Sequence, residues 1–135
     1  GVNDLTAGVS LKRWLAQQAD LVGLLRARFR ARQVLLSALP PMHLFPALPQ
    51  PLRWYLGAQA DRFNDGLAAW AATRDDCRFV STDFAPDAAA MASDGFHPGP
   101  PAYAHWAALL ARHIAAGQLE ATRIDVGNGE TRYGR

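Results

Sequence analysis

The sequence predicts an α/β fold with parallel strands, and three features of the chain lead to this prediction. Three long segments repeat apolar residues at the helical period, and two short apolar runs have the composition of buried strands. These segments alternate along the chain as helix, strand, helix, strand and helix. Strands joined through a crossover helix run parallel, so the two strands are expected to belong to one parallel sheet.

The predicted helices cover residues 11–32, 52–73 and 102–116. In the first of them, apolar residues from Leu11 onward recur at spacings of three, four and seven, which places them on one face of a helix. Ser10 precedes this pattern and is predicted to cap the helix N-terminus. The other two segments carry similar stripes of large apolar side chains.

The predicted strands cover residues 33–39 (QVLLSAL) and 77–82 (CRFVST), which are short and apolar, as in strands that are buried on both faces. Cys77 is expected to be buried in the second strand. A proline-rich loop at 40–51 follows the first strand, and a loop at 83–98 follows the second. Open α/β sheets keep their ligand sites beyond the carboxyl ends of the strands, which is where the first loop begins.

Composition argues against several classes of function. The net charge is only +2, and no broad polycationic surface follows from it. Arg26, Arg28, Arg30 and Arg32 lie near a helix C-terminus, where they complement the helix dipole, so we expect no nucleic-acid binding. No segment approaches the ~20 apolar residues of a membrane span. A single cysteine allows neither an internal disulfide nor a zinc cluster, and the compartment stays open between cytoplasmic and exported.

The residues with the clearest chemical meaning lie at 94–98 (DGFHP). Asp94 precedes His97 in a turn that contains glycine and is closed by proline. A carboxylate this close can accept the Nδ1 proton of the imidazole and leave Nε2 free as a general base. Taken alone, the pair has two other interpretations. His97 could cap the following helix while Asp94 forms a turn, and a metal site would need further ligands that the nearby sequence does not supply.

A second short motif, GVND at residues 1–4, gives this pair a specific context. G-x-N-D far upstream of D-G-x-H-P resembles the last two sequence blocks of the SGNH (GDSL-type) hydrolases. Residues 40–42 (PPM) and 48–54 (LPQPLRW) resemble the family as well. The resemblance implies the three-layer α/β/α flavodoxin-like fold of these enzymes. This chain would supply its C-terminal part, with about two parallel strands and three helices.

The resemblance also suggests where the domain ends. We expect residues 1–117 to be the C-terminal part of a single SGNH hydrolase domain. Residues 118–135 are polar and without a period, so we expect a poorly ordered tail.

The resemblance implies a role for each residue of the two motifs. His97 would be the general base, Asp94 would orient it, and Asn3 would donate its side-chain amide to the oxyanion. Gly1 would allow a close backbone approach, and Asp4 would brace the loop. The alternative interpretation of Asn3 is an asparagine in a turn that follows a strand.

Three apolar residues of the proline-rich loop are candidates for a substrate pocket. Met42, Phe45 and Leu48 could form the wall of an acyl or alcohol site, or the loop could simply pack on the sheet. The sequence alone leaves both interpretations open.

The Gly-Asp-Ser block that carries the nucleophile in SGNH hydrolases does not occur in this sequence, and Ser10, Ser37, Ser81 and Ser93 all lie outside such a block. The resemblance therefore implies that the nucleophile lies in a missing N-terminal segment of the same protein, and that this chain alone is inactive. The intact protein would be a serine esterase for small acyl esters, without metal or cofactor. Carbohydrate deacetylation and thioester cleavage use the same machinery. A non-catalytic or truncated binding module is the alternative from a different class.

Overall fold

The computed structural model of the chain describes residues 1–82 and 90–129. The elements follow one another as α1 (Val2–Thr6), α2 (Leu11–Phe29), β1 (Val34–Ser37), the 3-10 helix η1 (Met42–Leu44), α3 (Leu52–Ala72), β2 (Cys77–Val80) and α4 (Pro100–Gly129). The three long helices and the two strands are those that the sequence predicts. The mixed α/β class is therefore confirmed.

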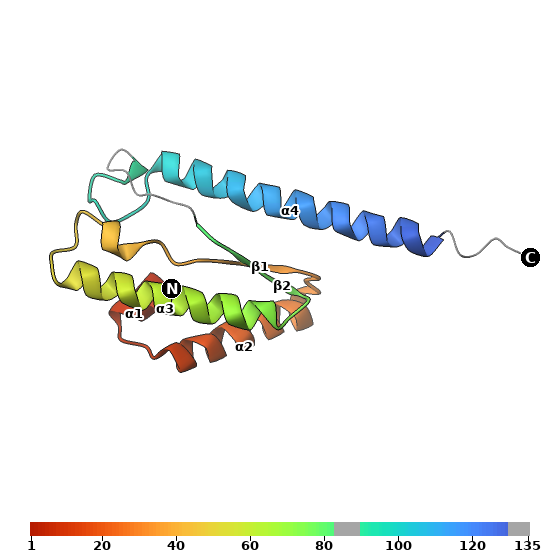
Figure 1. Cartoon of the computed structure of the whole chain (residues 1–135), viewed down its shortest axis with the longest axis horizontal. Helices are drawn as coiled ribbons and strands as arrows, with labels where there is room; N and C mark the ends of the chain where they lie inside the picture. Colours follow the sequence, from red (N-terminus) through yellow and green to blue (C-terminus); the bar gives the residue numbers. More distant parts are fainter. Residues whose placement is uncertain (83–89, 130–135) are drawn as a thin grey trace, which may run out of the picture.

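The two strands form a parallel pair, as the crossover through α3 requires. Val34 lies opposite Cys77 and Ser37 lies opposite Val80. Within the described residues, β1 pairs with β2 only, so its other edge carries no strand. Figure 1 shows α4 on one side of this pair and α2 and α3 on the other, an arrangement of three layers.

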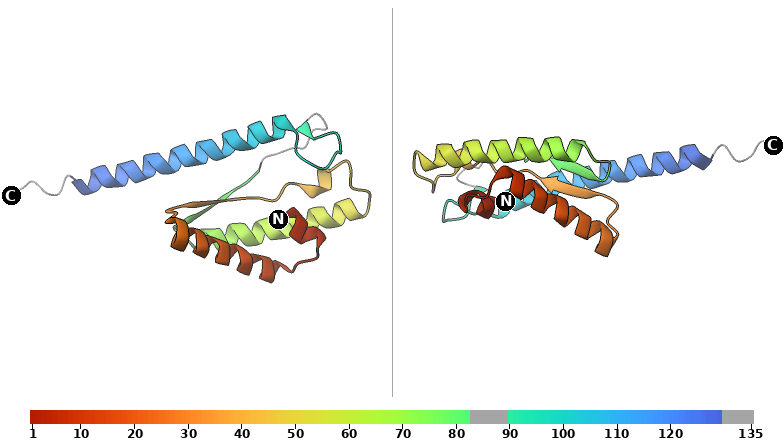
Figure 2. Two further views of the ribbon diagram at one scale, coloured as in Figure 1. Left: turned by 180° about the vertical axis from the view of Figure 1, so that it is seen from behind. Right: turned by 90° about the horizontal axis from the view of Figure 1, so that it is seen from below.

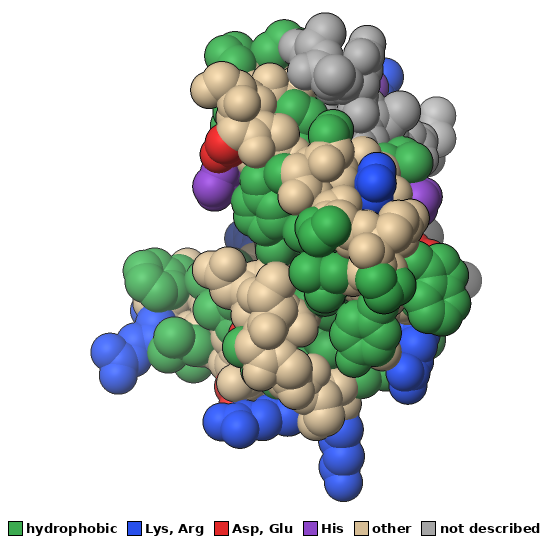
Figure 3. Space-filling view, turned by 90° about the vertical axis from the view of Figure 1, so that its left-hand side faces the viewer, with side chains coloured by type: hydrophobic (Ala, Val, Ile, Leu, Met, Phe, Trp, Pro, Cys, Tyr) green, Lys and Arg blue, Asp and Glu red, His purple; other side chains and the backbone are tan. Residues whose placement is uncertain are grey.

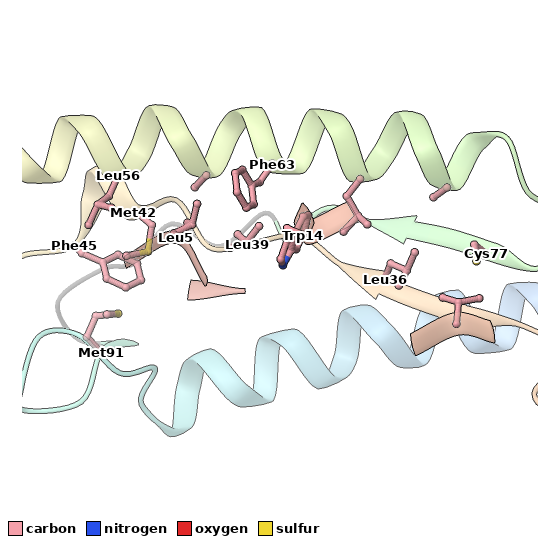
Figure 4. Close-up of a cluster of buried hydrophobic side chains, with 14 residues drawn as sticks. Leu5, Trp14, Leu36, Leu39, Met42, Phe45, Leu56, Phe63, Cys77 and Met91 are labelled. Carbon is pink, nitrogen blue, oxygen red and sulfur yellow. The ribbon is translucent and has the colours of Figure 1, made fainter. Parts of the chain in front are cut away.

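The core lies between α3 and the strands and is closed by α1, α2 and η1 (Figure 4). The side chains of Leu56, Phe63 and Leu67 are buried at helical spacing along α3. Trp14 of α2 packs on Phe63 with ring centroids 4.9 Å apart. Cys77 is buried at the start of β2, as predicted, and burial raises the pKa of its thiol.

The first long helix begins and ends at identifiable caps. The Ser10 hydroxyl accepts a hydrogen bond from the Arg13 backbone N–H at 3.4 Å, which confirms the predicted N-cap. At the other end, Arg30 takes the left-handed conformation with φ 53° and stops the helix at Phe29, a little before the predicted end at residue 32.

Two further helices, α1 and α4, differ from the prediction. Residues 1–4 were expected to form a loop, but most of them belong to α1, a helix too short to show a repeating apolar pattern. The last helix was expected to end at Ala116, but α4 continues to Gly129 and extends past the sheet (Figure 2). A single Gly117 costs a helix only about 1 kcal/mol, and good helix formers follow it, so it does not end α4.

Irregular structure was predicted for two regions, the loop after β2 and the C-terminal tail, and part of each lies outside the described residues. Residues 83–89 of the loop after β2 and residues 130–135 of the tail lie outside the described residues. The domain limit at residue 117 stays a prediction. Across 1–82 and 90–129, no helix is both long and apolar enough to cross a membrane.

Candidate active site

The carboxyl ends of both strands point toward one end of the molecule, at the left of Figure 1. The same end carries η1, the start of α3 and the loop at 90–99, which holds the Asp94–His97 motif. Gly1 lies here too, because a Cβ added to it would contact the Leu39 side chain at 3.6 Å, just beyond β1. The fold therefore brings both sequence motifs to the edge of the sheet where parallel α/β proteins bind ligands.

Asp94 and His97 form the hydrogen bond that the sequence predicts. The Asp94 Oδ2 lies 2.6 Å from His97 Nδ1. The other carboxylate oxygen, Oδ1, accepts the backbone N–H groups of Phe96 at 3.0 Å and His97 at 2.9 Å. Gly95 between them has φ 65°, a conformation that side chains with a Cβ rarely adopt. One carboxylate thus shapes the turn and orients the imidazole at once.

These bonds also hold Asp94 in its ionised form. Its pKa lies well below the usual range, first because of the His97 side chain and then because of the two backbone N–H groups. The carboxylate is therefore present as a hydrogen-bond acceptor throughout the neutral pH range. The His97 side chain is 69% exposed, so its ring is accessible while Nδ1 is occupied. Such an imidazole can exchange a proton at Nε2.

An isolated antiparallel bridge and two backbone hydrogen bonds join the two ends of the loop that carries His97. Met91 and Pro98 form an isolated antiparallel bridge. The Ala92 N–H donates to the His97 carbonyl at 2.8 Å, and the Gly99 N–H donates to the Ala90 carbonyl at 2.8 Å. The backbone of His97 is consequently held from both sides before α4 begins.

Phe96 attaches this loop to the rest of the site. Its ring meets Phe45 edge to face with centroids 5.6 Å apart, and it meets the His97 ring in the same way at 5.4 Å. The Ala47 N–H also reaches the Gly95 carbonyl at 3.4 Å. The proline-rich loop therefore helps to position the histidine.

The segment after β1 packs closely on α3. A Cβ added to Gly57 would lie 2.5 Å from the His43 Cβ, so glycine is required for the helix and η1 to approach this closely. Met42 is completely buried in the core, and Leu48 packs against it. Phe45 is buried as well but lines an apolar cavity. Met42 therefore belongs to the hydrophobic core. The substrate-pocket role of Met42, Phe45 and Leu48 stays a prediction.

The N-terminal motif forms the first turn of the chain. The Asp4 carboxylate accepts a hydrogen bond from the Gly1 nitrogen at 2.5 Å, and the bracing role expected of Asp4 stays a prediction. Asn3 is exposed on α1, and its backbone carbonyl accepts the Ala7 N–H at 3.0 Å. Among the described residues, its side-chain amide has no hydrogen-bond partner. That amide is free to bind a ligand.

Asn64 is a positioning residue that the sequence analysis missed. Its Oδ1 accepts the Leu39 N–H at 2.7 Å, and its Nδ2 donates to the Leu39 carbonyl at 3.0 Å. It thereby fixes the backbone of Leu39, the residue whose side chain lies next to Gly1. Asn64 lies between Ala60 and Leu67 on the buried stripe of α3, and an amide at an apolar position is the signal that could have identified it.

Hydrophobic side chains form several patches on the surface at this end, among other side chains and backbone (Figure 3). Leu44, Leu52, Trp54 and Tyr55 are large exposed hydrophobic side chains from η1 and the start of α3.

Within 1–82 and 90–129, no group of three or more histidine, cysteine, aspartate or glutamate side chains is placed to hold a metal ion.

A known protein family matches most of the chain. The sequence profile of the GDSL-like Lipase/Acylhydrolase family matches residues 1–105, a range that includes both motifs. The chain therefore belongs to the GDSL-like Lipase/Acylhydrolase family, the SGNH-type hydrolases, and its parallel strands with their helices fit part of the flavodoxin-like fold. Comparisons with curated proteins and with solved structures gave no match.

Proposed function

We propose that this chain is the C-terminal part of a serine ester hydrolase that acts on small acyl esters. The observation that carries the proposal is the 2.6 Å contact between Asp94 and an exposed His97, within a sequence of the GDSL family. The nucleophilic serine would lie in a segment upstream of residue 1. No cofactor is needed for this chemistry.

In the proposed reaction the serine Oγ attacks the ester carbonyl while Nε2 of His97 takes the hydroxyl proton. The Asp94 carboxylate holds Nδ1 and stabilises the imidazolium that results. The Asn3 amide donates a hydrogen bond to the oxyanion. When the C–O bond breaks, the imidazolium gives its proton to the departing alcohol, and an acyl-enzyme remains. Water, deprotonated by the same histidine, then releases the acid and regenerates the serine.

The test uses two proteins, this chain and an extended protein in which the chain follows the segment that precedes it in its gene. We expect no turnover of nitrophenyl acetate by the chain alone, because an acid and a base without a nucleophile form no acyl-enzyme. The extended protein should hydrolyse the ester and form a covalent fluorophosphonate adduct on an upstream serine.

Two outcomes would contradict the proposal. Turnover by the chain alone that disappears in His97→Ala would place the nucleophile among its own serines. An extended protein with neither turnover nor adduct would favour a binding module. A panel of alkyl esters, acetylated sugars and thioesters then separates the reactions that share this machinery.

A further inference from the structure

An apolar cavity lies beside the loop that carries the proposed base, between the start of α4 and the carboxyl ends of the strands. Its walls include Ala38, Phe45, Pro98, Ala102, Trp106 and Leu109. The lining surface is apolar throughout, although His105 also borders the cavity. The Trp106 Nε1–H donates to the Ser37 hydroxyl at 3.1 Å, so the indole turns its polar atom to β1 and offers carbon to the cavity.

The cavity touches the loop of His97 on two sides. Pro98, the residue after His97, forms part of one wall. Phe45 forms part of another and packs edge to face on Phe96, the residue before His97. A group bound in this cavity would therefore lie next to the loop that carries His97, the proposed base.

From this placement we propose that the cavity is the acyl pocket of the enzyme and that it selects short, unbranched acyl chains. The inference rests on the proposed ester hydrolysis and names its substrate class. The cavity encloses about 40 Å³. This is room for about three carbon groups, since about 10–15 Å³ of such volume holds one water-sized group. An acyl chain of about four carbons, counting the carbonyl, fills it.

The occupant must be apolar, because a polar group would lose its hydrogen bonds to water and find none in these walls. An acyl chain meets this condition, and its carbonyl carbon would stay outside, where the catalytic groups act. Each methylene that leaves water adds about fourfold to binding. A butanoyl group has two more methylenes than an acetyl group, so butanoyl esters should exceed acetyl esters by about 15-fold in kcat/KM.

The experiment changes the size of the cavity in the extended protein. Ala102 is 2% exposed and lines the cavity, so Ala102→Val fills it. This variant should lose the preference for butanoyl over acetyl esters while acetyl turnover stays within about twofold. Leu109→Ala enlarges the cavity and should move the best substrate to a longer chain. Ala104→Val makes the same change at an exposed position of the same helix and should keep the original preference.

A binding measurement separates failure of the pocket from failure of the proposed reaction. Methyl butanoate is titrated into the His97→Ala form of the extended protein, and the NMR shifts of the Leu109 methyl groups are followed. We expect shifts that disappear when Ala102→Val is added and persist with Ala104→Val. Absence of turnover with these shifts present would overturn only the ester hydrolysis. Unchanged acyl preferences in both cavity variants, or no shift at Leu109, would overturn the pocket.

Discussion

The two ends of the sheet each hold an aspartate whose pKa is lowered, yet only one of these aspartates belongs to the proposed catalytic site. At the amino end, Arg74 donates to both oxygens of Asp76 at 2.8 Å, and Arg26 binds the same carboxylate. At the carboxyl end, Asp94 is bound by His97 and by two backbone N–H groups. Both carboxylates are ionised at neutral pH.

The two carboxylates differ in the side chains that bind them. The bidentate bond from Arg74 is the main reason that the pKa of Asp76 falls to about 2. A guanidinium stays charged and donates only, so this cluster joins α2 to the segment before β2 and can exchange no proton. His97 has a second ring nitrogen that can take and return a proton. A lowered carboxyl pKa is thus common to both ends, and what distinguishes the proposed catalytic pair is a partner that can take and return a proton.

The largest expected effect separates the two ends by activity. In the extended protein, Asp94→Asn should lower kcat by about 10²–10⁴-fold, because an amide leaves the imidazole without its anionic partner. Asp76→Asn should keep kcat within about twofold. Steady-state kinetics with a nitrophenyl ester measures both.

Circular dichroism of each variant shows whether the fold is retained. Equal losses of kcat in the two variants, with both folded, would break the comparison. The Asp76 cluster would then be part of the catalytic machinery in spite of its place at the opposite end of the strands.

The second prediction concerns Asn3, the proposed oxyanion donor. Asn3→Ala in the extended protein should lower kcat by about 10²–10³-fold with KM little changed, since the donor acts on charge that develops in the transition state. Asn3→Asp keeps the shape but removes the donor and should lose as much. A rise in KM at constant kcat would instead assign Asn3 to ground-state binding.

Much of the fold could be predicted because its signals are local. The stripe of Leu56, Phe63 and Leu67 indicates one buried helix face from spacing alone. The crossover rule then makes the strands parallel without knowledge of their register. The short α1 was missed because its one buried side chain, Leu5, cannot form a repeat. The end of α4 was placed too early because the residues after Gly117 are polar and show no apolar period.

The candidate site likewise combines local contacts, which could be predicted, with non-local contacts, which could not. Asp94 and His97 are three residues apart and share one turn, so their bond follows from the local sequence. The bond between Asn64 and Leu39 joins residues 25 positions apart and exists only once α3 packs beside β1. The contact of Phe96 with Phe45 is equally non-local. Chemistry was therefore predictable where it lies within a turn, and the packing that supports it was not.

The third prediction tests whether the carboxyl end depends on this packing. Asn64→Leu leaves the N–H and the carbonyl of Leu39 unpaired in a partly buried position and should reduce the free energy of unfolding by about 1–3 kcal/mol. Asp65→Leu introduces the same side chain at an exposed neighbour and serves as the control. Urea unfolding followed by circular dichroism measures the difference. Equal stability of the two variants would remove Asn64 from the support of the site.

The smallest expected effect is the pH dependence of stability at the amino end. The pKa of Asp76 is lowered in the folded chain, so its contribution is complete above the ordinary value of 3.8 and is lost as the pH falls toward about 2. Asp76→Asn should lose stability at neutral pH and show a shallower fall in Tm between pH 4 and pH 2. Asp75→Asn, at the exposed neighbour, should retain the steep fall. The fall that remains in Asp76→Asn should include the contribution of Asp94, whose pKa is also lowered, so Asp94→Asn in the same background should flatten it further. A steep fall that survives both changes would show that neither end of the sheet sets the acid stability of the fold.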